Sequence, residues 1–290
     1  MSKIKKIFSR RSFIFTPPLK INMFDKAVKS GVDIVCLELE DGIAPSDKLF
    51  ARQNALKIIN KKKDYNNIEV LIRINSIREI FGILDITAIL NNKTQPDGLL
   101  VPKIKSPEEL KILDNLFTEK KLNTKFHAII ETNSGLEKAN EIAASTDRLE
   151  ALFFGAVDMS AELRCQNSWN NLLYARSKVV HAAASKQLDV IDVPFLDLDN
   201  LKKMKEEATN SKNLGFTGKG AIHPKQIKTL NNVFTPSLKE VKKAKKIISL
   251  FEKSSSGLVL YEGKLIEKPV LREMYRVVNI YNKVNNSECE

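Results

Sequence analysis

The stretch VCLELEDGIAPSDK, residues 35–48, decides the fold of this chain. Leucines alternate with Glu38 and Glu40, Asp41 follows, and a glycine and a proline then end the extended segment. An alternation with a period of two predicts a β-strand with two different faces. One face is apolar, whereas the other becomes acidic toward the carboxyl end of the strand. We therefore expect the acidic end to lie at a functional site rather than inside a core.

The pattern of a short apolar run followed by a segment with helical periodicity repeats along the chain. Strands are predicted at residues 11–16, 34–40, 69–74, 98–103, 125–131, 149–155, 188–195 and 216–223. Helices are predicted near residues 20–30, 46–60, 82–91, 106–119, 134–145, 171–187, 199–213 and 224–232. Alternating strands and helices pair in parallel through right-handed crossovers, and eight such units predict an α/β fold of the (β/α)8 TIM barrel type. A doubly wound sheet is the alternative, but the loop TPPLK after the first strand is not the glycine-rich turn typical of that fold.

The repeating pattern ends near residue 235. A lysine-rich helix is expected at about 237–252, followed by the strand-like segment LVLYEGKLIE and a last helix from Pro269. We therefore predict two parts, a (β/α)8 barrel over residues 1–235 and a C-terminal extension over residues 236–290. This helical extension is expected to act as a lid or as an oligomer contact.

The net charge of +12 is unevenly distributed, because residues 201–253 hold 13 lysines against 4 glutamates. A face that binds a polyanion such as nucleic acid is one interpretation. The lysines fall between apolar residues at helical spacing, however, and aromatic side chains for base stacking do not alternate with them. Solvated helix faces are the better interpretation, so we predict no nucleic-acid partner. A basic rim could still attract a small anionic ligand.

Composition and cysteine content indicate a globular protein of the cytoplasm. The chain is 43% apolar and 28% charged, and no apolar run approaches the ~18 residues of a membrane span. The basic N-terminus lacks the long apolar core and the cleavage site of a signal peptide. Three scattered cysteines, Cys36, Cys165 and Cys289, argue against a disulfide framework and suit a reducing compartment.

The two-residue alternation of side-chain direction also places polar side chains on the inward face of the predicted barrel, near the carboxyl ends of its strands. The residues expected at this rim are Glu38, Glu40, Arg73, Lys103, Glu131, Asp158, Asp192 and His223. Active sites of TIM barrels lie at this end. Buried carboxylates cannot all stay ionised without compensation, and an all-oxygen ligand set suits Mg²⁺.

Glu131 and Asp158 are the expected Mg²⁺ ligands, because they end the adjacent strands five and six. Glu40 and Asp41 would bind water molecules of the metal. Glu131 could instead cap the next helix, although Ser134 is better placed for that role, and Asp158 could itself cap a helix. The pairing of the two carboxylates favours the ligand interpretation for both.

Arg73 is the expected partner of a substrate carboxylate, because a guanidinium binds a carboxylate through two parallel hydrogen bonds. A 2-oxo acid could then bind the metal through its oxo and carboxylate oxygens, which suits aldol or Claisen chemistry. An ion pair between Arg73 and Glu38 across the lumen is the structural alternative. His223 is expected to brace the turn after strand eight.

A series of segments gives the chain a likeness to one family. The segments are RRSFIFTP, VDIVCLELEDGIAPSDKLFAR, VLIRIN, LLVPKI, IIETNSGLEKANEIAAS, LEALFFGAVDMSAEL, IDVPFLDLDN and GFTGKGAIHPKQI. Together, from about residue 10 to residue 275, the chain resembles the citrate lyase β-subunit-like family of the HpcH/HpaI aldolase and malyl-CoA lyase superfamily. The resemblance implies a TIM barrel that binds Mg²⁺ and forms trimers or larger assemblies such as hexamers.

The resemblance also implies an activity and the residues for it. The activity is reversible cleavage of a 3-hydroxyacyl thioester of the citryl, malyl or citramalyl type to a 2-oxo acid and an acetyl thioester on CoA or an acyl carrier. The family motifs place the metal ligands on Glu131 and Asp158, the substrate-binding arginine on Arg73, and the acidic pair on Glu40 and Asp41.

Two segments depart from the family pattern. Relatives often carry DG.MID.P near the C-terminus, and its last aspartate is proposed to act on the acyl group from a lid or a neighbouring subunit. This chain reads YEGKLIEKP, with Glu267 at that place, and its first loop, TPPLK, lacks a glycine after the proline. Arg11 and Lys103 are further candidates for binding the substrate.

Two other functions stay open. One is a simple pyruvate-type aldolase without a thioester, which is disfavoured because members of that branch tend to carry a histidine where this chain has LED. The other is a regulatory protein that binds an oxo acid without catalysis.

Overall fold

The computed structural model describes residues 9–61, 65, 68–254 and 257–286. The chain divides into two compact units, one over Arg10–Asn231 and another that includes the described residues from Asn232 onward. The division thus falls after residue 231, where the sequence analysis places it after residue 235.

Eight parallel strands form a closed barrel in which each strand pairs with the next and β8 pairs with β1. The strands are β1 (Ser12–Thr16), β2 (Ile34–Glu38), β3 (Glu69–Arg73), β4 (Gly98–Val101), β5 (Lys125–Ile130), β6 (Leu149–Phe154), β7 (Asp189–Asp192) and β8 (Gly218–Ala221). All eight predicted strands are present, and the predicted TIM barrel is confirmed.

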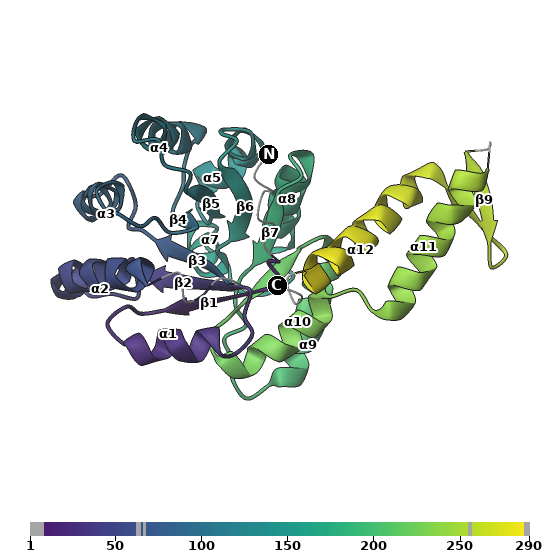
Figure 1. Cartoon of the computed structure of the whole chain (residues 1–290), viewed down its shortest axis with the longest axis horizontal. Coiled ribbons are helices and arrows are strands. Elements are labelled where there is room, and N and C mark those ends of the chain that lie inside the picture. Colours follow the sequence, from purple (N-terminus) through teal and green to yellow (C-terminus); the bar gives the residue numbers. More distant parts are fainter. Residues whose placement is uncertain (1–8, 62–64, 66–67, 255–256, 287–290) are drawn as a thin grey trace. The chain divides into compact units, whose positions relative to one another are not determined.

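Helices follow the strands and surround the barrel (Figure 1). They are α1 (Ile21–Val28), α2 (Lys48–Asn60), α3 (Ile80–Leu90), α4 (Pro107–Glu119), α5 (Asn133–Glu137), α6 (Ala139–Ala143), α7 (Ala156–Glu162), α8 (Leu173–Ser185), α9 (Leu201–Leu214) and α10 (Ile227–Phe234). Short 3₁₀ helices lie at Pro45–Asp47 and Pro224–Gln226. The single helix predicted at 134–145 is divided into α5 and α6. Thr132, rather than Ser134, caps α5 by accepting a hydrogen bond from the Gly135 amide (3.0 Å).

Apolar side chains fill the lumen of the barrel. The cluster contains Phe13, Ile34, Cys36, Leu71, Leu100, Ile129, Ala151, Phe153 and Ile191. Ile34, Cys36, Leu71 and Ile129 therefore share the inward face of their strands. Because such a lumen is a packed core and no channel, polar chemistry is restricted to the two ends of the barrel.

A cluster of ion pairs closes the amino end of the barrel. Arg10 donates hydrogen bonds to both carboxylate oxygens of Glu69, at 2.6 and 2.8 Å, and to Glu150 and Asp189, at 2.6 and 3.0 Å. Nε2 of His127 lies 3.2 Å from Glu69. Glu69 and Asp189 are the first residues of β3 and β7, so this cluster lies at the end opposite to the expected functional rim.

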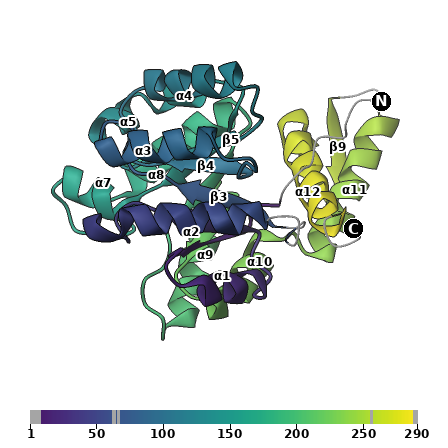
Figure 2. The same ribbon diagram turned by 60° about the vertical axis from the view of Figure 1, so that its left-hand side comes forward.

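The C-terminal unit consists of two long helices and a hairpin. In chain order these are α11 (Leu238–Lys253), the antiparallel strands β9 (Leu258–Tyr261) and β10 (Lys264–Glu267), and α12 (Lys268–Asn286). Helices α11 and α12 pack along each other, as both views show (Figures 1 and 2). The helix, strand-like segment and last helix that we predict for this part are all present.

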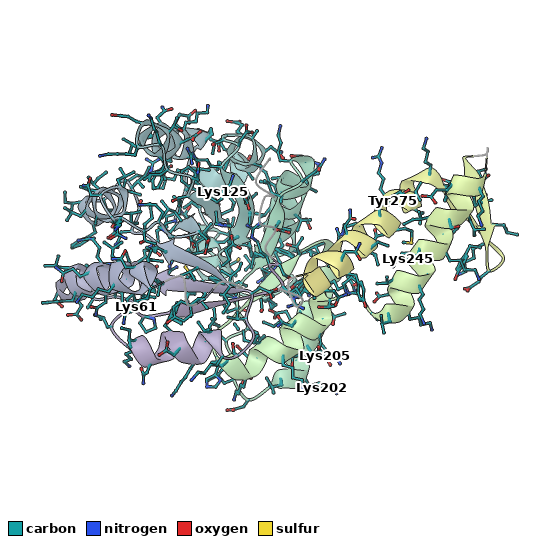
Figure 3. All side chains as sticks on the ribbon, viewed as in Figure 1. Lys61, Lys125, Lys202, Lys205, Lys245 and Tyr275 are labelled. Carbon is teal, nitrogen blue, oxygen red and sulfur yellow. The ribbon has the colours of Figure 1, made fainter. Side chains whose placement is uncertain are left out.

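Lysines of α9 and α11 lie on the outer faces of these helices. Lys202, Lys205 and Lys245 are exposed (Figure 3), whereas Met204 and Ala208 of α9 are buried. This arrangement agrees with solvated helix faces. Within the described part of the chain, no helix combines the length and the apolar character that crossing a bilayer requires.

Candidate active site

Glu131 lies buried at the carboxyl end of β5. Its Oε1 accepts a hydrogen bond of 2.7 Å from the backbone amide of Lys103, which follows β4. Lys103 has a left-handed backbone conformation with φ of 50°. A non-glycine residue adopts this conformation at a cost of about 1–3 kcal/mol. A strained turn after β4 therefore presents the amide that holds the carboxylate in place.

Burial and the neighbouring carboxylates perturb the ionisation of Glu131. Burial, followed by the negative charges of Glu40 and Asp158, raises the pKa of Glu131 to about 8, although the Lys103 amide and Arg73 act in the opposite direction. Carboxylates gathered in this way are stabilised when a cation binds between them. The chemistry of this set of oxygen donors therefore fits a hard divalent ion such as Mg²⁺.

Gly155 leaves the space that the Glu131 side chain occupies. A Cβ atom at position 155 would collide with Oε2 and Cβ of Glu131. Gly155 also precedes α7, whose first turn carries Asp158. A glycine between β6 and α7 thus allows the ends of β5 and β6 to bring both carboxylates to the same part of the rim.

The substitution Gly155→Ala should weaken Mg²⁺ binding by about tenfold or more, because the added methyl group displaces the Glu131 carboxylate. Backbone strain is not expected, since φ of Gly155 is −101°. Titration calorimetry with Mg²⁺ measures the effect. Gly257→Ala is the matched control, because a Cβ there meets nothing within 4 Å. An unchanged affinity of Gly155→Ala would show that Glu131 does not bind the ion.

A cavity of about 500 Å³ opens at this rim. Its lining consists of Ser76, Arg78, Glu79, Lys103, Lys105, Glu131, Thr132, Asp158, Ala161 and Glu162. Both expected metal ligands, Glu131 and Asp158, therefore face one space. The described residues contain no group of three or more His, Cys, Asp or Glu placed to hold a metal. A pair of carboxylates remains compatible with Mg²⁺, which usually keeps several water molecules and takes only one or two protein carboxylates.

Arg73 is held beside the acidic end of β2. Its Nε donates to Glu38 at 2.6 Å, and its Nη1 lies 3.0 Å from Glu40. The guanidinium also stacks on the ring of Phe15, 4.4 Å from the ring centre. The ion pair with Glu38, the structural alternative for Arg73, is thus present in the structure. This ion pair orients the guanidinium of Arg73 at the rim. Arg73 itself does not line the cavity.

Lys103 links the acidic pair to the cavity. Its Nζ donates to both carboxylate oxygens of Asp41, at 2.9 and 3.1 Å, and lies 2.9 Å from Glu40. Burial alone would lower the pKa of Lys103, but Asp41 and Glu40 outweigh it and raise that pKa. Glu40 therefore lies between two cations, Arg73 and Lys103, and Lys103 contacts Glu131 through its amide. The structure brings these predicted residues into one continuous network.

The structure does not place Arg11, a predicted substrate-binding residue, at the rim. Arg11 precedes β1, and its side chain donates to both carboxylate oxygens of Asp33, at 2.9 and 2.8 Å. Asp33 precedes β2, so this pair lies at the amino ends of the strands. The physical reason is strand direction, because a residue before a strand cannot reach the rim beyond its carboxyl end.

Asp192 is also absent from the rim, contrary to expectation. Ile191 occupies the inward position of β7, so Asp192 faces the helices. There it accepts hydrogen bonds from Lys219 (2.6 Å), Ser211 (2.6 Å) and Arg176 (3.1 Å).

Two other predicted residues lie outside the network. His223 accepts a hydrogen bond at Nδ1 from the Lys225 amide (3.1 Å), which confirms that it braces the turn after β8. Glu267 ends β10 in the C-terminal unit and is exposed. Its role in catalysis stays a prediction.

Sequence reasoning missed several residues of the cavity lining. Ser76, Arg78 and Lys105 lie in the loops after β3 and β4, and Glu162 ends α7. The two-residue alternation of side-chain direction holds only within strands, so it does not predict which loop residues face the cavity. The position of Ser76, Arg78 and Lys105 shortly after the carboxyl end of a strand is the signal that would have predicted them as site residues.

A closed barrel whose carboxyl end gathers carboxylates, an arginine and a lysine around a cavity has the form of a TIM-barrel enzyme. The HpcH/HpaI aldolase/citrate lyase family matches residues 11–224, which is most of the chain. The chain belongs to this family.

Relatives with known names agree with this assignment. The citrate lyase subunit beta of Haemophilus influenzae is 31% identical over 274 residues, which cover 90% of this chain and 93% of the relative. An L-malyl-CoA/beta-methylmalyl-CoA lyase of Cereibacter sphaeroides is 30% identical over 297 residues, with 92% of this chain and 93% of the relative covered. Both relatives are named lyases, and this chain is an enzyme of the lyase class.

A solved structure in this family is similar as well. The citrate lyase beta subunit of M. tuberculosis, solved with oxaloacetate and magnesium, is 25% identical to this chain with a TM-score of 0.66. The match covers 79% of this chain and 98% of the other.

Proposed function

We propose that the chain is a Mg²⁺-dependent carbon–carbon lyase. It cleaves a 3-hydroxyacyl thioester of the citryl, malyl or citramalyl type reversibly to a 2-oxo acid and an acetyl thioester. The observation that carries this proposal is that Glu131 and Asp158 line one cavity at the barrel rim. The names of the relatives and the oxaloacetate and magnesium of the M. tuberculosis structure support it.

The residues of the rim have distinct roles in this proposal. Glu131 and Asp158 would hold Mg²⁺, which when bound supplies a Lewis acid for the oxo group of the substrate. Arg73, oriented by Glu38, would bind the substrate carboxylate. Lys103 adds positive charge at the cavity wall, where the anionic substrate enters.

Glu40 and Asp41 would accept protons or hydrogen bonds at the reacting end, since they lie next to the two cations. Cleavage requires removal of the proton from the 3-hydroxyl group, and condensation requires removal of a proton from the acetyl group. Glu267 would act on the acyl group. The carboxylate there is one methylene longer than the family's aspartate, so its reach differs.

An assay of acetyl-CoA with oxaloacetate, glyoxylate or pyruvate, each with and without Mg²⁺, tests the function. We expect condensation with at least one oxo acid only when Mg²⁺ is present. A rise in melting temperature with Mg²⁺ and an oxo acid, but no condensation, would instead support an oxo-acid-binding regulatory protein. Aldol cleavage of a free hydroxy acid without a thioester would support the simple aldolase.

The substitution Arg73→Ala should weaken oxaloacetate binding roughly 10- to 100-fold, because a charge-assisted hydrogen bond to the substrate is lost. Calorimetry in the presence of Mg²⁺ measures the affinity, and circular dichroism checks the fold. Arg148→Ala, which removes an arginine that pairs with Asp114 away from the cavity, is the matched control. If Arg73→Ala lowers stability but leaves oxaloacetate affinity unchanged, Arg73 serves only its pair with Glu38.

We propose in addition that the chain forms a homo-oligomer, a trimer or hexamer, in the cytoplasm. Helix α3 exposes Ile80, Ile83 and Leu84, and exposed apolar patches are typical of protein interfaces. Cys36 and Cys165 are free, which suits a reducing compartment, while Cys289 lies outside the described residues. Light scattering should give a molar mass of three or six chains. The thioester carrier would be CoA or an acyl-carrier protein.

A further inference from the structure

A second cavity, of about 530 Å³, lies between the segment before α8 and the loop after β7. Its lining includes Trp169, Arg176, Pro194, Phe195 and Lys203. Glu131, Asp158 and Arg73 do not line it. The function proposed above gives this cavity no role.

Arg176 is the feature that points to a ligand. The residue is only 3% exposed, and its guanidinium lies over two aromatic rings, 4.9 Å from the centre of Phe154 and 4.8 Å from that of Trp169. Nε donates to Asp192 at 3.1 Å, but the buried Nη1 has no hydrogen-bond partner among the described residues. A buried donor without a partner costs about 1–3 kcal/mol, so an acceptor oxygen placed here would be bound favourably.

Nearby carboxylates do not pair with Nη1 of Arg176: Asp192 contacts Arg176 through Nε, and Asp197 and Glu207, which also line the cavity, have other partners. Asp192 accepts from Lys219 at 2.6 Å, and Glu207 lies 2.9 Å from the same ammonium group. Asp197 accepts from the Asp199 amide at 3.0 Å. By contrast, the Lys203 ammonium group makes no ion pair with any residue that the structure describes. The cavity therefore offers two cationic donors to an incoming anion.

The remaining walls are apolar or aromatic. Trp169 is half-buried, Phe195 is buried, and Pro194 lies beside it. Flat rings and a proline favour a ligand body that is planar or apolar. We propose that this cavity is a second ligand site, which binds a small monocarboxylate with its carboxylate on Arg176 and Lys203 and its planar or apolar body against Trp169.

Trp169 is the only tryptophan of the chain, so its fluorescence reports directly on this cavity. Titration of the full chain with benzoate should give a saturable change in emission, whereas benzamide, its neutral analogue, should bind at least about tenfold more weakly. Calorimetry provides an affinity that does not depend on fluorescence. The Glu131→Gln variant should bind benzoate unchanged, which separates this site from the catalytic rim.

Two variants test the assigned contacts. Arg176→Lys keeps a charge opposite Asp192 but removes Nη1, and it should weaken benzoate about tenfold or more. Arg148→Lys, the same change at a residue outside the cavity, is its control. Val157→Phe adds bulk to the cavity wall without altering Arg176, and it should block benzoate even if Arg176→Lys fails to fold. Absence of saturable binding, equal affinity for benzamide, or unchanged binding in Val157→Phe would overturn the proposal.

Discussion

The Glu131→Gln variant should lose Mg²⁺-dependent condensation of acetyl-CoA with an oxo acid by more than about 100-fold. Glutamine keeps the size of the side chain and an oxygen that can accept from the Lys103 amide. It removes the negative charge, and loss of a direct metal ligand should exceed the 10- to 100-fold effects typical of outer contacts. Initial rates at saturating Mg²⁺, together with calorimetric titration of Mg²⁺, measure the loss.

A matched variant separates this effect from a general change in the charge of the cavity. Glu79→Gln removes the same charge from the same lining, but Glu79 is exposed at the start of α3. We expect Glu79→Gln to change the rate by less than about threefold, since exposed charges are strongly screened. If Glu131→Gln retains normal Mg²⁺ affinity while Asp158→Asn loses it, the first ligand has been assigned to the wrong strand.

Strand alternation was sufficient to predict much of the site. It placed Glu38, Glu40 and Glu131 inward at strand ends, and the structure connects all three with Arg73 or Lys103. The signal is physical, because a polar residue on the lumen side of a buried strand must find a partner at the rim. The same reasoning gave the wrong face for Asp192. Ile191 is the inward residue of β7, and a shift of one residue along a strand exchanges its inward and outward faces.

Other parts of the site depend on contacts that no pattern in the sequence contains. The left-handed turn at Lys103 occurs at a lysine, a residue that seldom signals this conformation. The requirement for Gly155 arises only because Glu131 from another strand fills the space beside it. Long-range packing of this kind becomes visible only when the strands are placed side by side.

The number and order of the eight strand-and-helix units could be predicted from the sequence. Apolar runs marked most of the strands, although β8 reads GKGA. The break between α5 and α6 falls at Lys138, three residues after Gly135, and the sequence analysis did not expect it. The ion cluster at the amino end was equally hidden. Arg10 and Glu69 are 59 positions apart, and they meet only because β1 and β3 belong to one closed barrel.

Burial of this cluster has a consequence for the pH dependence of stability. Burial alone would raise the pKa of Glu69, but the charges of Arg10 and His127 overcome it and lower that pKa to about 2. A carboxyl group whose pKa is lower in the folded state stabilises the fold above its ordinary pKa, near 4.5. This contribution is lost as the pH falls from about 4.5 toward 2.

The Glu69→Gln variant should therefore be less stable at neutral pH by about 3–5 kcal/mol, because Arg10 stays buried without its two-pronged partner. Urea unfolding followed by circular dichroism measures the difference. It should shrink in the acidic range, where protonation of Glu69 removes the same interaction from the native chain. Glu119→Gln, a charge loss at an exposed position of α4, should shift stability by less than about 0.5 kcal/mol. A difference that stays constant from neutral pH to pH values near 2 would mean that packing, rather than the ionised carboxylate, closes this end of the barrel.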